Sequence, residues 1–104
     1  ARGVDGRPWP WGDHYEPEFC RAERPGLHPI GRFPHDQSPY GVRELVTGVI
    51  EWTLTAARDD PGACYVRGGC SAIDLHHQPC TGRLTRDPRE PSPFIGFRLV
   101  IAAR

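Results

Sequence analysis

The sequence contains no methionine, no lysine and no asparagine, so every one of its 13 basic side chains is an arginine. These arginines are balanced by 13 acidic residues, which gives a formal net charge of zero. A chain without excess positive charge has no electrostatic footprint for nucleic acid. No apolar run reaches the roughly 18 residues that a membrane-spanning helix needs. We therefore expect neither nucleic acid nor a membrane as a partner.

Long uninterrupted segments are also scarce, because 12 glycines and 12 prolines are spread over 104 residues. Each proline removes a backbone donor and fixes φ, so the stretch from Ala1 to Tyr40 is expected to be loop. A disordered chain would have few large apolar side chains, whereas this one has 3 Trp, 3 Tyr and 4 Phe. The irregularly spaced residues expected to pin this loop to a core are Trp9, Trp11, Tyr15, Phe19, Ile30 and Phe33.

Three segments have the β-branched and aromatic composition that is typical of strands. They are Val49–Thr55, Cys64–Arg67 and Phe94–Ala102, and we expect them to form one small sheet with Trp52 and Phe97 in its core. Residues 41–46 are compatible with a single helical turn, residues 59–62 predict a turn, and residues 87–93 predict a loop. These segments predict an irregular, loop-rich fold, either α+β or all-β, in a single domain.

Four cysteines are present, at positions 20, 64, 70 and 80, without a C-x-x-C pair. Two disulfides are compatible with this number, in three connectivities. Free buried thiols are the expectation for a cytosolic chain, and the cytoplasm is the compartment that we favour. Cys70 and Cys80 are expected to be buried thiols or a bridge.

Four motifs in order carry a family resemblance. They read D-G-R-P-W-P-W-G-D at 5–13, S-P-Y-G-V-R-E-L-V-T-G-V-I-E-W at 38–52, R-G-G at 67–69 and G-F-R at 96–98. Together they resemble the formylglycine-generating-enzyme, or sulfatase-modifying-factor, family. The resemblance implies a C-type-lectin-like fold and aligns residues 1–104 with the C-terminal part of one such domain. It also implies that the missing N-terminal part of the domain is a partner, in a longer or nicked protein; a trimmed chain is the alternative.

The resemblance places a structural calcium site within residues 44–51. Calcium takes six to eight oxygen ligands from carboxylates and carbonyls. The matching ligands are the side chains of Glu44 and Glu51 and the carbonyls of Thr47 and Val49. Glu44 and Thr47 depart from the family's usual Asp/Asn and Gly. The alternative is that Glu51 pairs with an arginine or caps backbone amides under Trp52. Arg98 of G-F-R is expected to make a salt bridge or carbonyl contacts.

The family's oxidases hold copper through two cysteine thiolates, since soft sulfur selects the cuprous ion. Counting from Cys70, the matching positions hold Ile73 and Gln78, and neither is a thiol. Cys80 is the one cysteine near the second position. No copper is therefore expected. A zinc site built from Cys70, His76, His77 and Cys80 has suitable ligand types but an unsuitable spacing.

The sequence thus favours a non-catalytic module that binds a protein or a small-molecule ligand. It is similar to copies of the domain attached to bacterial signalling proteins, and to variable proteins diversified by retroelements just before a G-F-R ending. The expected ligand-binding residues are Ala72, Ile73, Asp74, Leu75, His76, His77 and Gln78. The alternative is a copper-dependent oxidase that turns a substrate cysteine into formylglycine, with Cys80 as its thiol.

Overall fold

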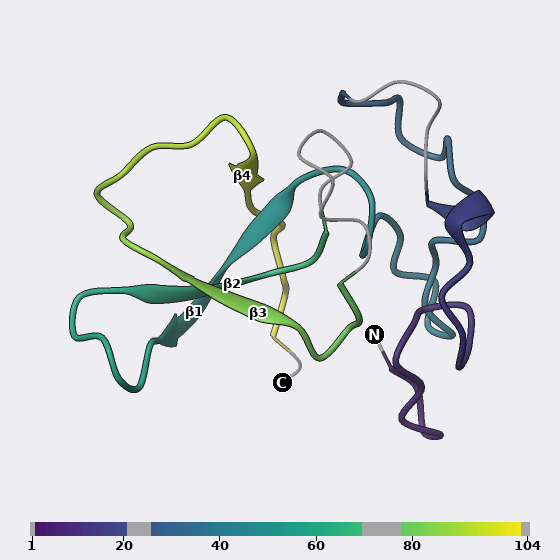
Figure 1. The fold of residues 1–104 in the computed structure, drawn as a ribbon, viewed down its shortest axis with the longest axis horizontal. Helices are drawn as coiled ribbons and strands as arrows, with labels where there is room; N and C mark the ends of the chain where they lie inside the picture. The colour runs from purple at the N-terminus through teal and green to yellow at the C-terminus, as the bar shows by residue number, and fades with distance from the viewer. Residues whose placement is uncertain (1, 21–25, 70–77, 103–104) are drawn as a thin grey trace.

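The computed structural model describes residues 2–20, 26–69 and 78–102. Two regions lie side by side (Figure 1). We call residues 2–20 and 26–49 the loop layer, and the described residues of 50–96 the sheet region. None of the described residues forms a helix with the length and apolar character needed to cross a bilayer.

The sheet region is built on four strands in the order β3-β2-β1-β4. Strand β1 (Ile50–Ala56) pairs antiparallel with β2 (Cys64–Arg67), and Trp52 lies opposite Val66. Strand β3 (Arg83–Arg86) pairs antiparallel with β2 at one edge. Strand β4 (Ile95–Gly96) pairs parallel with the start of β1 at the other edge. Long-range pairing therefore gathers segments from residue 50 to residue 96 into one mixed sheet.

A tight turn joins β1 to β2 where Asp59-Asp60-Pro61-Gly62 predicts one. The Ala57 amide donates to the Ala63 carbonyl at 2.8 Å, and the Ala63 amide donates to the Asp60 carbonyl at 3.1 Å. Gly62 has φ of 91°, a conformation that a side chain would disfavour. The predicted turn and the strand Cys64–Arg67 are both confirmed, and β1 is shifted by one residue from the prediction.

The apolar core of the sheet region is small. Ile50 and Val66 are almost completely buried, at 1% and 0% exposure. Partly buried residues pack against them, namely Trp52, Leu84, Phe94 and Ile95. Trp52 therefore contributes to the core as expected, although it is half-buried rather than enclosed.

The loop layer has one short 3-10 helix, η1 (Pro17–Phe19), among its described residues. A second cluster of buried residues in this layer is made of Trp9, Cys20 and Val46. The Trp9 and Trp11 rings stack with centroids 5.7 Å apart. The aromatic anchors of the prediction are thus buried or half-buried, but Ile30 is 87% exposed. Ile30 was wrongly predicted because it lies in a turn that the Arg32 amide closes on the Pro29 carbonyl at 3.1 Å.

Two further predictions about elements were wrong. The strand predicted at Phe94–Ala102 ends at Gly96, and Phe97 is 73% exposed. Only Ile50 and Glu51 of β1 lie opposite β4, so the chain beyond Gly96 has no partner strand in the described residues. Residues 41–46 form no helical turn, because the amides of Leu45 and Val46 donate to the side chain of Asp36.

Strand β3 was not predicted, because Leu84 is the one apolar residue among its four and no alternation is visible. The described residues confirm a loop-rich fold with a small sheet and little helix. The C-type-lectin-like architecture stays a prediction.

Candidate functional site

Asp36 organises the turn that carries the predicted metal ligands. Its side chain is fully buried, at 0% exposure. One carboxylate oxygen accepts the amides of Leu45 and Val46 at 3.2 and 3.1 Å. The other accepts the amides of Val46 and Thr47 at 2.9 and 2.8 Å and the Thr47 hydroxyl at 2.7 Å. A carboxylate satisfies these donors in place of a helix or sheet, which fixes the path of residues 45–47.

Glu44 lies at the start of the same turn in a left-handed conformation, with φ of 59°. Its Oε1 accepts the Gly31 amide at 2.9 Å. Its Oε2 lies 2.8 Å from the Thr47 hydroxyl, which also contacts Asp36. A hydroxyl has a single hydrogen to donate, so Thr47 bridges two carboxylates and satisfies one at a time. Each oxygen of the Glu44 carboxylate therefore lies within hydrogen-bond distance of another group of the chain.

Glu51 lies on β1 and pairs with Arg98, which follows β4. The two guanidinium nitrogens Nε and Nη2 each donate to one Glu51 carboxylate oxygen at 2.6 Å. Arg98 also donates to the carbonyls of Arg43 and Glu44, each at 3.0 Å. The bonds to Glu51 raise the pKa of the Arg98 guanidinium. The predicted arginine partner of Glu51, and the salt bridge and carbonyl contacts of Arg98, are both confirmed.

The four predicted calcium ligands lie close together in the fold, but they differ in the hydrogen bonds that they already make. Glu44 and Thr47 contact each other, and Arg98 links Glu51 to the Glu44 carbonyl. Within the described residues, no donor bonds to the carbonyl of Thr47 or of Val49. Those two carbonyls suit a cation, whereas Glu51 already binds a positive charge. A calcium ion at this turn requires Glu51 to share its carboxylate with Arg98 or to release it, and the site stays a prediction.

The predicted ligand-binding residues lie mostly outside the described part of the chain. Ala72, Ile73, Asp74, Leu75, His76 and His77 are not described, and neither is Cys70 of the zinc alternative. Gln78 is half-buried, and its Oε1 is buried without a hydrogen-bond partner.

Cys80, which lies two residues after Gln78, is a free thiol and forms no disulfide. Its amide donates to the Pro8 carbonyl at 2.7 Å, so the segment is tied to the loop layer. Partial burial raises the pKa of the Cys80 thiol. A small pocket of about 100 Å³ lies beside it, lined by Leu45, Glu51, Arg67, Gly68 and Cys80. A protonated thiol is a poor nucleophile and a poor metal ligand.

Two features of the site could not be found from the sequence. Asp36 is one of 13 acidic residues, and no motif distinguishes it from the others. Arg83 on β3 lies over the Tyr65 ring at 4.1 Å, a cation–π contact that depends on the unpredicted pairing of β2 and β3. In both cases the partner is distant in sequence or lies on an unpredicted strand.

Comparison with known proteins identifies similar chains. A family model described as the sulfatase-modifying factor enzyme 1-like domain matches residues 1–103. A mouse protein named inactive C-alpha-formylglycine-generating enzyme 2 is 28% identical over 120 residues, which cover 97% of this chain and 39% of the relative. The protein of the same name from cattle is also 28% identical over 120 residues, with 97% and 40% coverage. The chain thus spans about two fifths of the length of these relatives.

Proposed function

Because the chain belongs to the sulfatase-modifying factor enzyme 1-like family, we propose that it is a non-catalytic binding module on that family's scaffold. The observation that carries the proposal is chemical. The positions that match the paired copper-binding cysteines hold Ile73 and Gln78, which have no thiol. Two relatives whose names describe them as inactive support the same conclusion.

The surroundings of Cys80 argue in the same direction. A thiol must lose its proton to bind copper, and burial raises the pKa of Cys80, which favours the protonated form. Its neighbour Gln78 presents a neutral amide oxygen. The residues at this end of the segment therefore do not supply the two thiolates that a cuprous site takes, and we derive no oxidation step for the chain.

The ligand is proposed to bind at residues 72–78. This segment lies within residues 70–93, which differ most from the sequence typical of the family, and the residues that follow it contact the Arg67 side chain. Arg67 donates to the carbonyls of Cys80 and Thr81, each at 3.4 Å. Loops on a rigid scaffold often carry the recognition of a protein or small molecule, and the proposal assigns that role to this segment. A sensor domain and a retroelement-diversified variable protein are two forms of this function.

A structural calcium ion remains part of the proposal. The donor set would be Glu44, Glu51 and the carbonyls of Thr47 and Val49. The two carbonyls have no other donor among the described residues, which supports the site. Bound calcium would stabilise the turn that leads from the loop layer into β1.

An activity assay tests the absence of catalysis. The chain is loaded with copper and incubated with a cysteine-containing peptide, and conversion of the peptide thiol to an aldehyde is followed by mass. We expect no turnover. Turnover that disappears in Cys80→Ser but persists in Cys64→Ser would overturn the proposal and establish the oxidase instead.

A loop-swap experiment tests the binding function. Residues 72–78 are replaced by a Gly/Ser segment of equal length, and both proteins are screened against purified glycans and peptides. We expect a ligand that binds the parent chain and not the swapped chain, while circular dichroism shows that both are folded. Equal binding by the two chains would move the site away from this segment.

A further inference from the structure

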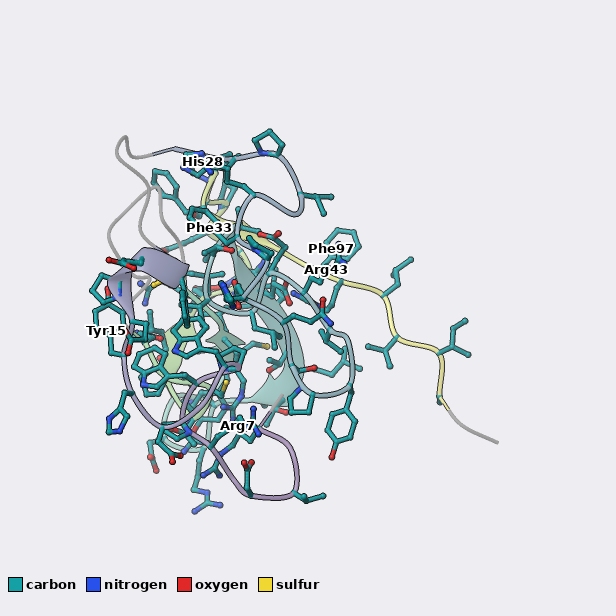
Figure 2. The ribbon with its side chains drawn as sticks, turned by 90° about the vertical axis from the view of Figure 1, so that its right-hand side faces the viewer. Arg7, Tyr15, His28, Phe33, Arg43 and Phe97 are labelled. Carbon is teal, nitrogen blue, oxygen red and sulfur yellow. The ribbon has the colours of Figure 1, made fainter. Side chains whose placement is uncertain are left out.

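The two edges of the sheet differ in length. At the β4 edge only Ile95 and Gly96 are paired, and Figure 2 shows the chain running away from the rest of the molecule after Phe97. At the other edge, every residue of β3 (Arg83–Arg86) lies opposite a residue of β2. The β3 edge is therefore a complete strand in a fixed register, and among the described residues it has a neighbouring strand on one side only.

The backbone of β3 offers hydrogen-bonding groups along its outer side. In an antiparallel pair, every second residue directs its N–H and C=O groups away from the partner strand. Apart from the ladder with β2, no backbone–backbone hydrogen bond within the described part of the chain involves residues 83–86. In that part, the one side chain that bonds to this backbone is that of Arg86, which is exposed and donates to the Thr85 carbonyl at 2.8 Å. A strand that arrives from solvent can therefore pair with β3.

One face of this edge carries positive charge. Residues that lie opposite each other in a ladder point to the same face, so Arg83 and Thr85 share a face with Arg67 and Tyr65. The Arg83 guanidinium lies 4.1 Å from the centroid of the Tyr65 ring. The Arg67 guanidinium makes two long hydrogen bonds to carbonyls, each of 3.4 Å. Neither arginine forms an ion pair with a described residue.

Two acidic side chains that flank this face are already bound elsewhere. Glu51 lies opposite Arg67 on β1, but both of its carboxylate oxygens accept hydrogen bonds from Arg98. Asp87 follows β3 directly, and Arg89 donates to both of its oxygens. Like charges directly opposite each other in a ladder destabilise it. An anion that binds beside the two opposed arginines of β2 and β3 would relieve this repulsion.

The other face of the β3 edge begins with an apolar residue. Leu84 lies opposite Val66 and packs against the buried pair of Ile50 and Val66. It is half-buried, so part of its side chain remains accessible at the edge, and Arg86 follows on the same face at the end of the strand. An added strand would therefore meet charge on one face and apolar surface on the other.

We propose that the β3 edge is a docking site for an extended segment of another protein in which acidic and apolar residues alternate. The backbone of the segment pairs with β3, its carboxylates face Arg83 with Arg67 beside it, and its apolar side chains cover Leu84. Charge complementarity selects this occupant. A second copy of this chain would bring its own β3 arginines against these, and charges at an edge oppose such self-pairing. The surface is additional to the ligand-binding segment proposed at residues 72–78.

Fluorescence anisotropy with short labelled peptides tests the proposal. One peptide alternates glutamate and valine, a second alternates lysine and valine, and a third has the composition of the first with its glutamates and valines in separate blocks. We expect saturable binding of the first peptide and at least about tenfold weaker binding of the other two, because both charge and alternation must match the edge. Equal binding of all the peptides, or no binding of the first, would overturn the proposal.

N-methylated peptides separate strand addition from attraction between charges alone. Successive amides of an extended peptide point to opposite sides, so methylation of the glutamate amides and methylation of the valine amides remove donors from opposite edges of the first peptide. We expect one of the two modifications to abolish binding and the other to leave affinity within about twofold, since one edge of the peptide pairs with β3. The same effect of both modifications would contradict strand addition.

Matched variants of the chain locate the site. Arg83→Gln is expected to weaken binding of the first peptide at least about fivefold, because a charge-assisted contact is lost. Arg32→Gln is the control, since it also removes one positive charge and one cation–π contact, that of Arg32 with Phe33 in the loop layer. Circular dichroism verifies that both variants are folded. Equal weakening in the two variants would overturn the assignment, as would a dimer of the chain, seen in sedimentation, that the peptide dissociates.

Discussion

The sheet region and the loop layer are stabilised by different means. In the sheet region, backbone groups pair along strands, and Ile50 and Val66 are buried together. In the loop layer, the Asp36 carboxylate accepts the amides of three consecutive residues, Leu45, Val46 and Thr47. Buried amides must be satisfied in both regions. In the loop layer, buried amides therefore depend on individual polar side chains for their hydrogen bonds. In the sheet region, the carbonyls of neighbouring strands accept those bonds along many residues.

The largest effect is expected from Asp36→Ala. The substitution leaves the amides of Leu45, Val46 and Thr47 without an acceptor in a buried turn. Each buried donor without a partner costs about 1–3 kcal/mol, so we expect the free energy of unfolding to fall by about 3–5 kcal/mol. Urea denaturation followed by circular dichroism measures it.

Asp36→Asn is the matched variant, since it keeps one acceptor oxygen and nearly the same volume. We expect it to lose less stability than Asp36→Ala. Equal losses in the two variants would show that the shape of the residue contributes little and that the second acceptor oxygen or the negative charge is what stabilises the turn. A loss below about 1 kcal/mol for Asp36→Ala would remove the contrast between the two regions.

The next effect is expected in the sheet region, from Ile50→Ala. Ile50 is 1% exposed, and truncation of a buried isoleucine costs about 2–5 kcal/mol through lost transfer energy and the cavity that remains. Leu54→Ala on the same strand is the control, because an exposed substitution changes stability by about 0.5 kcal/mol or less. A large loss in Leu54→Ala would mean that a partner covers that face.

Local patterns in the sequence were sufficient for the strand Cys64–Arg67, the turn at residues 59–62 and the anchoring role of Trp9. These elements are determined by neighbouring residues: β-branched side chains, a Pro-Gly turn and an apolar ring among prolines. The arginine partner of Glu51 was also predictable, because Arg98 of the G-F-R motif was expected to make a salt bridge or carbonyl contacts.

The errors about strands share one physical cause, which is that a strand requires a partner. Phe97 lies in a segment whose residues alternate as in a strand, but only Ile50 and Glu51 of β1 pair with β4, so the pairing ends before Phe97. The segment Arg83–Arg86 shows no alternation of apolar and polar residues, yet each of its residues lies opposite a residue of β2, and Arg83 lies opposite Arg67. The role of Asp36 depends on a turn nine or more residues away along the chain. Pairing partners and long-range hydrogen bonds are not local properties of a sequence.

A smaller effect is expected where the two regions are joined, from Arg98→Ala. The salt bridge to Glu51 and the carbonyl bonds to Arg43 and Glu44 connect the end of the sheet to the loop layer. Both charged side chains retain solvent contact, so screening limits the salt bridge to about 1 kcal/mol or less. The two carbonyl bonds add about 1 kcal/mol, for a total loss in stability of about 1–2 kcal/mol. Thermal unfolding at low and high salt measures it, and an effect that does not decrease with salt would assign it to packing.

The same variant sharpens the calcium prediction. Removal of Arg98 frees both oxygens of Glu51, so calcium should raise the unfolding midpoint of Arg98→Ala more than that of the parent chain. A ligand that binds only the native state must raise the midpoint. Glu51→Gln in the same background is the control and is expected to abolish the increase. An unchanged midpoint at millimolar calcium in all three proteins would exclude the site.

The smallest effect concerns the thiol buried in the loop layer. Cys20 is fully buried, and burial raises its pKa from 9.0 to about 11. A pKa raised in the folded state means that the unfolded chain loses its proton first as pH increases. The contribution of Cys20 is therefore fully present below pH 9 and decreases between pH 9 and about 11. At pH 10 we expect a loss of about 1 kcal/mol relative to pH 8, measured by urea denaturation.

In Cys20→Ala this part of the alkaline loss should disappear, whereas Val46→Ala, in the same cluster, should lower stability equally at both pH values. A parent and a Cys20→Ala variant with the same alkaline loss would show that the thiol titrates in contact with water.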